Sequence, residues 1–127
     1  CDFQDVFVKG AVKILNDGVV QNKDPEPFKK FTQTAGNVFG QMGQYSEKIQ
    51  DIILMELEKY KLKYKESRDG LIRDWPTNYR LNGWIVKMKN GGAITPHMHE
   101  QGWISGSVYI NVPPKSKKDS GNLVVCF

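Results

Sequence analysis

The chain has 127 residues, 39% of them apolar, with 18 Lys and Arg against 14 Asp and Glu, which suits one small domain rather than two. A charged fraction of 25% and an aromatic fraction of 11% differ from the composition of disordered chains. No apolar run approaches the roughly 20 residues that cross a bilayer, and the sequence opens without a secretory signal pattern. We therefore expect a single cytoplasmic domain over residues 1–127 with no membrane partner.

The small excess of positive charge comes from two local runs, KLKYK at 61–65 and KSKK at 115–118. A nucleic-acid groove usually shows basic residues interleaved with exposed aromatic residues over a longer stretch, so we interpret these runs as solvated surface and expect no nucleic-acid partner. The two cysteines, Cys1 and Cys126, stand at opposite ends of the chain. This spacing excludes a short-spaced thiolate metal site and favours reduced thiols.

The first part of the chain, up to residue 43, gives weak structural signals. The apolar pattern over 6–15 allows a short strand and then a short helix that stops at Asn16-Asp17-Gly18. The polar segment 21–27 contains two prolines and predicts a loop. Residues 32–43, with three glycines, indicate an irregular or short edge segment.

The clearest helix is predicted from Ser46 onward. Apolar residues recur behind Ser46 at helical spacing as far as Tyr64, and charged residues fill the other positions, which is typical of a helix packed on one side. Ser46 is the expected N-cap, and Asp69-Gly70 breaks the pattern. This helix is interpreted as scaffold, within a mainly helical region over 1–74.

From Leu81 the period changes from helical to alternating, which predicts strands. Trp84, Val86 and Met88 can face one side of the first strand, and a tight turn follows at 90–92. Further strands are expected over 94–99, over 103–112 and from residue 122. Short strands without crossover helices indicate an antiparallel sandwich or barrel, and so an α+β fold.

The only two histidines of the sequence, His97 and His99, occur in TPHMHE at 95–100. Residues i and i+2 of a strand point to the same face, so the two imidazoles can converge on one metal ion at about 2.0–2.2 Å. Zinc hydrolases, cupin-like proteins and iron oxygenases all use such a pair. The alternative is a pair of ordinary exposed histidines.

The predicted strand 103–112 has one apolar and one polar face. The polar face suits a pocket beside a metal, although a solvent-facing side of the sheet would have the same composition. It consists of Trp103, Ser105, Ser107, Tyr109 and Asn111. The apolar face, expected in the core, consists of Ile104, Gly106, Val108, Ile110 and Val112.

Four segments together resemble a known family: LNGWIVKM at 81–88, GG at 91–92, PHMHE at 96–100 and GWISGSVYINVP at 102–113. They are similar to the 2-oxoglutarate and Fe(II)-dependent oxygenases of prolyl-hydroxylase type that often follow tetratricopeptide repeats. The resemblance implies an α+β fold in which N-terminal helices (1–74) pack on a double-stranded β-helix, or jelly roll. Residues 75–127 would form its first part, so that the β-helix is incomplete in this chain.

The resemblance also implies a hydroxylase-type oxygenase with Fe(II) as cofactor and 2-oxoglutarate and dioxygen as co-substrates. The primary substrate is not indicated. In such a site the protein would supply three metal ligands and leave the other positions open. His97 corresponds to the first His of the family motif, and no catalytic residue beyond the metal ligands is implied. Tyr109 would hydrogen-bond a 2-oxoglutarate carboxylate, and Trp103 or Ser105 would line the cavity.

One position departs from the superfamily pattern, because His99 stands where most members carry a carboxylate. Either the site is a three-His variant or Glu100 turns in from the other strand face, and we favour His99 as the ligand. The distal His and the cation that pairs with 2-oxoglutarate are expected beyond Phe127, since no His or Arg follows His99. We therefore expect at least one further strand there, and no turnover of 2-oxoglutarate by this chain alone.

Two other classes of function remain open from the sequence. A non-catalytic, cupin-like module would use the His pair to hold zinc or another divalent ion, and iron-dependent succinate formation would distinguish it from an oxygenase. A pure interaction domain would hold no metal, which elemental analysis would reveal.

Overall fold

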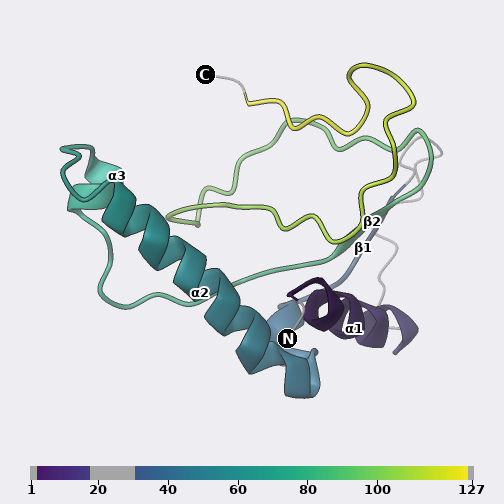
Figure 1. Ribbon diagram of the computed structural model, residues 1–127, viewed down its shortest axis with the longest axis horizontal. Helices are drawn as coiled ribbons and strands as arrows, with labels where there is room; N and C mark the ends of the chain where they lie inside the picture. The colour runs from purple at the N-terminus through teal and green to yellow at the C-terminus, as the bar shows by residue number, and fades with distance from the viewer. Residues whose placement is uncertain (1–2, 18–30, 126–127) are drawn as a thin grey trace.

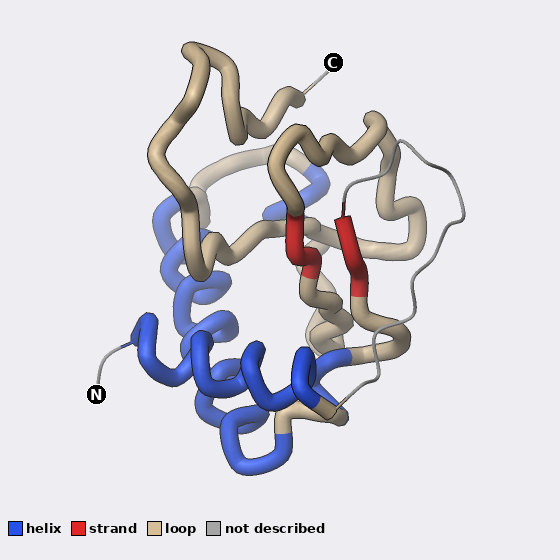
Figure 2. Tube along the Cα trace, turned by 90° about the vertical axis from the view of Figure 1, so that its right-hand side faces the viewer, coloured by secondary structure: helices blue, strands red, loops and turns tan. Residues whose placement is uncertain are grey.

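The computed structural model describes residues 3–17 and 31–125. The elements are α1 (Phe3–Asn16), β1 (Phe31–Gln33), the 3-10 turns η1 (Val38–Gly40) and η2 (Gly43–Tyr45), α2 (Ser46–Lys63), α3 (Gly70–Arg73) and β2 (Val86–Met88). The helices line one side of the molecule, where α2 runs from the region of α1 to α3, and long loops form the other side (Figure 1, Figure 2). The described part is therefore α+β, with a two-stranded antiparallel sheet. None of its helices is long and apolar enough to cross a membrane.

The core forms where α1 meets η1, η2 and the first half of α2. It contains Val6, Phe7, Ile14, Val38, Met42 and Ile49. The α1 members recur at helical spacing, so one stripe of that helix is buried. Gly10 lies on the same stripe, and a Cβ there would stand 2.9 Å from Cδ1 of Ile49, so the glycine allows the two helices to approach closely.

The short sheet is extended by hydrogen bonds that fasten residues 81–85 to residues 34–38. In the ladder, Phe31 pairs with Met88 and Gln33 with Val86. The buried Thr34 then donates its N–H to the Ile85 carbonyl (3.0 Å) and accepts the Ile85 N–H at its hydroxyl (2.9 Å). This double contact ties the segment before β2 to the core.

A second set of hydrogen bonds continues toward η1. The N–H of Val38 donates to the Gly83 carbonyl at 2.9 Å, and the N–H of Gly83 donates to Oδ1 of Asn37 at 3.1 Å. Asn37 also donates through Nδ2 to the Leu81 carbonyl at 2.9 Å. Residues 81–88 are consequently the best-anchored part of the chain after α3.

The helix predicted from Ser46 is confirmed, and the region before it differs in detail. The strand expected within 6–15 is absent, because Val6, Phe7 and Ile14 share one helical face and α1 runs through the whole segment. Ser46 is not the N-cap of α2, since Tyr45 holds that position and the Ser46 hydroxyl donates to the Phe39 carbonyl at 2.5 Å. The loop predicted over 21–27 lies outside the described residues.

The prediction of strands over 94–99, over 103–112 and from residue 122 is wrong for the described residues. Residues 89–125 form turns and irregular extended loops, except that the turn at 90–92 is confirmed by positive φ at Gly91 (74°) and a hydrogen bond from the Gly92 N–H to the Lys89 carbonyl. Alternating side chains make a strand only where another strand supplies ladder partners. Within the described ranges, the only such ladder joins β1 to β2.

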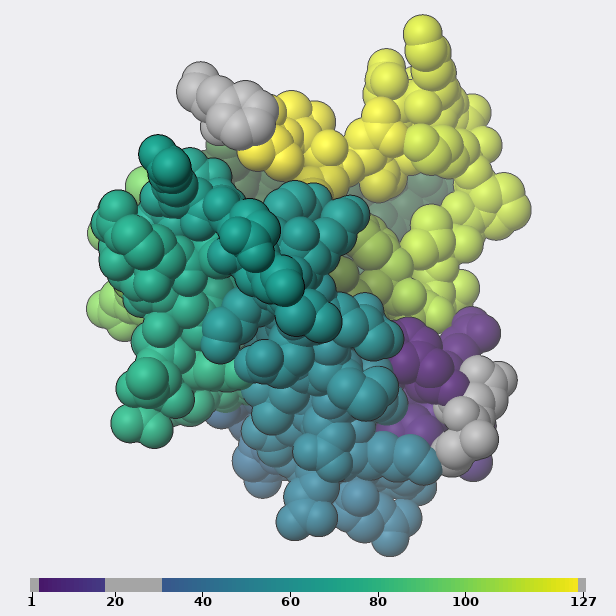
Figure 3. Space-filling model, turned by 60° about the vertical axis from the view of Figure 1, so that its left-hand side comes forward, coloured from purple at the N-terminus to yellow at the C-terminus, as the bar shows by residue number. Residues whose placement is uncertain are grey.

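The expected core face of residues 103–112 is also only partly buried. Ile110 packs against the core cluster, whereas Ile104 (37%) and Val108 (44%) are exposed to about the same extent as the polar face. The C-terminal segment, yellow in the space-filling view, rises above the helical part of the molecule (Figure 3). The alternating pattern of residues 103–112 therefore does not separate buried side chains from exposed ones.

Candidate metal centre

The two histidines lie side by side on the loop that follows the 90–92 turn. The ring centroids of His97 and His99 are 4.8 Å apart, and the rings are nearly perpendicular at 85°. Two imidazoles that bind one ion at about 2.1 Å have ring centres about 5 Å apart. The spacing thus fits a shared metal ion, although it arises in a loop rather than on the predicted strand face.

The imidazole of His97 is oriented by the backbone carbonyl of Thr95, two residues earlier. Its Nδ1 atom lies 2.8 Å from the carbonyl oxygen of Thr95. A carbonyl only accepts hydrogen bonds, so Nδ1 is the protonated nitrogen and Nε2 carries the lone pair of the neutral ring. This is the arrangement typical of metal-binding histidines, whose second nitrogen donates to a carbonyl or carboxylate.

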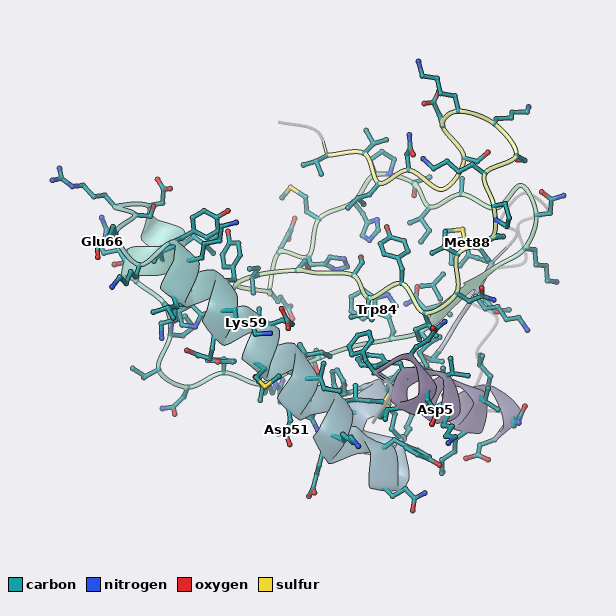
Figure 4. The ribbon with its side chains drawn as sticks, viewed as in Figure 1. Asp5, Asp51, Lys59, Glu66, Trp84 and Met88 are labelled. Carbon is teal, nitrogen blue, oxygen red and sulfur yellow. The ribbon has the colours of Figure 1, made fainter. Side chains whose placement is uncertain are left out.

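The imidazole of His99 packs on the indole of Trp84. The two ring centroids are 4.9 Å apart with the planes tilted by 48°. Figure 4 shows Trp84 between the helices and the loops that follow β2. After His99 the backbone turns back, because the N–H of Gly102 donates to the His99 carbonyl at 2.9 Å.

The other residues predicted for the site are not joined to the histidines. The indole N–H of Trp103 donates to the Leu71 carbonyl of α3 at 3.1 Å. Ser105 and Tyr109 are exposed, Tyr109 at 58%, and Glu100 is exposed beside the pair. Across 3–17 and 31–125 no hydrogen bond or ring contact links Trp103, Ser105 or Tyr109 to either imidazole, so their part in the site stays a prediction.

The donor set fits part of a metal centre. Imidazole nitrogens suit Fe(II) or Zn(II) as ligands, and His97 would offer its Nε2 because Nδ1 lies against the Thr95 carbonyl. Within the described ranges no group of three His, Cys, Asp or Glu residues is placed to hold one ion. The described residues therefore place two imidazoles near each other, without a third metal-binding side chain beside them.

Two contacts at this centre were missed by the sequence reasoning, the Thr95 carbonyl and the Trp84 indole. The first had a local signal, because Thr95 stands two residues before His97 and its carbonyl is within reach of the ring. The second had none, since fifteen positions separate Trp84 from His99 and no periodicity predicts their contact.

Two grooves open elsewhere on the described surface. One of about 420 Å³ lies between α1 and η2, and one of about 460 Å³ lies between η1, α2 and residues 79–81. Neither is lined by a residue predicted for the site. The candidate centre is an exposed pair of imidazoles that lies away from both grooves.

An exposed imidazole pair with one fixed tautomer defines a candidate centre for a divalent metal. Residues 82–124 match the family model described as "Putative 2OG-Fe(II) oxygenase", and this stretch is about a third of the chain. It includes Trp84, both histidines, Trp103, Ser105 and Tyr109. The match confirms the resemblance that the four sequence segments indicate. No curated protein and no solved structure matches the chain.

Proposed function

We propose that the chain provides part of an Fe(II)- and 2-oxoglutarate-dependent oxygenase domain of hydroxylase type. The observation that carries the proposal is the His97–His99 pair. Its ring centroids are 4.8 Å apart, and both residues lie within the stretch that matches the oxygenase family. Residues 1–127 would all belong to one domain, in which the N-terminal helices support an incomplete double-stranded β-helix that includes the β1–β2 ladder. Dioxygen and 2-oxoglutarate would be its small-molecule partners.

In this proposal His97 and His99 hold the metal. His97 would bind through Nε2, because its Nδ1–H is engaged by Thr95. Bound Fe(II) supplies the capacity to activate dioxygen at the expense of 2-oxoglutarate, which gives succinate and CO2. The Tyr109 hydroxyl would donate a hydrogen bond to a 2-oxoglutarate carboxylate, with Trp103 and Ser105 as cavity wall.

The test combines binding and turnover. Metal affinity is measured by calorimetry on protein without a histidine tag, with and without 2-oxoglutarate, under anaerobic conditions with Fe(II). We expect tighter metal binding with 2-oxoglutarate, because the co-substrate chelates the same ion, and succinate formation that requires Fe(II) and a complete ligand set. Two results together would contradict the proposal. The metal affinity would be the same with and without 2-oxoglutarate, and neither this chain nor a longer protein that contains it would form succinate.

A cupin-like, non-catalytic metal module is the second candidate. The observation in its favour is the all-imidazole donor pair, since His99 stands where oxygenases of this superfamily mostly carry a carboxylate, and such a pair suits Zn(II) as well as Fe(II). This candidate predicts that Zn(II) raises the thermal midpoint of unfolding as much with 2-oxoglutarate as without it.

A further inference from the structure

We propose that Trp84 is a positioning residue for His99, which connects the metal-binding loop to the rigid core. The inference rests on the proposed function, because it assigns Trp84 a role toward the metal that the two histidines would hold. The carrying observation is the packing of the Trp84 ring on the His99 ring at 4.9 Å. Trp84 itself has no metal-binding atom and would act only through His99.

Trp84 is well placed for this role, because the backbone on both sides of it is fixed. Gly83 exchanges hydrogen bonds with Val38 and Asn37, and Ile85 exchanges two with the buried Thr34. A Cβ on Gly83 would stand 3.0 Å from the Phe39 ring, so the segment lies tightly on η1. The indole is thus held at its base by the core, although Trp84 as a whole is 41% exposed.

The histidine loop, by contrast, has few anchors of its own. Residues 93–102 are all exposed, and Met98 between the two histidines is 79% exposed. The rings form a chain of contacts from Trp84 to His99 and from His99 to His97. Among the described residues, the contact between the Trp84 and His99 rings joins the loop to the anchored segment 81–88.

The contact matters because an exposed imidazole loses conformational freedom when it binds a metal. A ring that already packs against a fixed indole has fewer orientations to lose, so the same bonds give a higher affinity. An aliphatic side chain at position 84 would remain apolar but would lose the flat face on which the imidazole lies. Phenylalanine would be apolar and would keep a flat aromatic face.

The experiment measures Co(II) binding to the full chain without a histidine tag by calorimetry. We expect Trp84→Leu to raise the Kd about three- to tenfold, below the 10–100-fold effect of losing a hydrogen-bonded outer partner, and Trp84→Phe to stay within about twofold of wild type. Trp75→Phe is the matched control, because Trp75 contacts Tyr79 and Lys61 instead of a histidine. Circular dichroism verifies that each variant is folded.

A second readout uses the wild-type protein alone, so that it holds even if a variant does not fold. Addition of Zn(II) should shift the NMR signal of the Trp84 indole N–H together with the ring protons of His99, and leave the Trp75 signal in place. An unmoved Trp84 signal with bound Zn(II), or an unchanged Kd in folded Trp84→Leu, would overturn the positioning role only. Absence of metal binding in wild type would instead overturn the proposed function, and the positioning role with it.

Discussion

At the scale of single residues, the orientation of His97 and His99 depends on atoms that are not metal ligands. The Thr95 carbonyl fixes which nitrogen of His97 carries the proton, and Trp84 provides the surface on which His99 rests. Sequence spacing could predict the pair, because only two histidines occur and they are two residues apart. It could not predict Trp84, since that contact depends on how the loop after β2 folds back.

The ligand assignment gives the first prediction. His97→Ala and His99→Ala should each weaken divalent-metal binding at least about tenfold, because each removes one of two imidazole ligands. Glu100→Ala should leave the affinity nearly unchanged, because Glu100 is exposed and forms no three-residue metal-binding group with the two histidines in the described part of the chain. Calorimetry with Co(II) measures all three. A larger loss in Glu100→Ala than in His99→Ala would transfer the second ligand position to Glu100.

The same centre should respond to pH in a defined direction. Metal-binding imidazoles must be neutral, so protons compete with the ion and the affinity should fall as the solution is acidified. A titration of Co(II) affinity at several pH values in wild type and His97→Ala tests this. The slope of log affinity against pH should be smaller in the variant, which has one imidazole fewer to deprotonate. Equal slopes would exclude His97 as a ligand.

At the scale of elements, the long helix α2 was predictable, α1 was predicted only in part, and α3 and the loops in place of the later strands were not predicted. The burial of Ile49 and the exposure of Met55 follow from their places on the face of α2, which is a local property of the sequence. A strand depends on a partner that can stand anywhere in the chain. Residues 103–112 alternate clearly, yet without a ladder within the described part the pattern predicted neither their structure nor their burial.

The packing of α2 on α1 gives a prediction about the stability of the fold. Ile49 is fully buried at 0% exposure and contacts the Gly10 position, so Ile49→Ala should lower the free energy of unfolding by about 2–5 kcal/mol. Met55, on the same helix but 57% exposed, is the matched control, and Met55→Ala should change it by about 0.5 kcal/mol or less. Urea unfolding followed by circular dichroism measures both. An equal loss of unfolding free energy in the two variants would show that Ile49 does not lie on the buried face of α2.

The hydrogen bond between Tyr79 and Glu58 joins the segment after α3 to α2 and gives a pH prediction. Burial, then the charge of Glu58 and its hydrogen bond, raise the pKa of the Tyr79 hydroxyl above its ordinary value of 10.0. Because the folded pKa is raised, this contribution to stability is complete below pH 10 and is lost as the pH rises through the folded pKa.

Replacement of the carboxylate separates these causes. Glu58→Gln should lower the pKa of Tyr79 part of the way toward 10.0, because the charge is removed while the burial, the largest cause, remains. An NMR titration of the tyrosine ring carbons follows this residue, with Tyr109 as an internal reference on a different part of the chain. A pKa unchanged by the substitution would show that Glu58 does not contact the phenol.

At the scale of the whole molecule, the described chain divides into a packed helical part and an exposed part. The buried apolar residues all come from α1, η1, α2 and the turn between η1 and η2. After β2, large apolar side chains remain exposed, among them Met98 (79%), Leu123 (70%) and Val124 (77%). The candidate metal centre lies in the exposed part and touches the packed part through Trp84.

This division predicts a two-level pattern of amide hydrogen exchange. Amides in α1, the first half of α2 and the β1–β2 ladder donate within regular structure and should exchange slowly, near the rate of global unfolding. In the described part after residue 93, backbone-to-backbone donors are limited to turns at Gly102, Ser120 and Asn122. Amides over 103–112 should therefore exchange orders of magnitude faster than those of α2.

Addition of Zn(II) makes the measurement specific for the candidate centre. Metal bound by His97 and His99 should slow exchange over 95–102, where the ligands are, and at Gly83–Ile85, which support Trp84, while 115–122 serves as the internal control. The bound ion opposes local opening of the loop by mass action, since it binds only the closed arrangement of both imidazoles. Slow exchange over 103–112 before any metal is added would contradict the division, because it would require ladder partners for that segment and would restore the strand that its alternating sequence predicts.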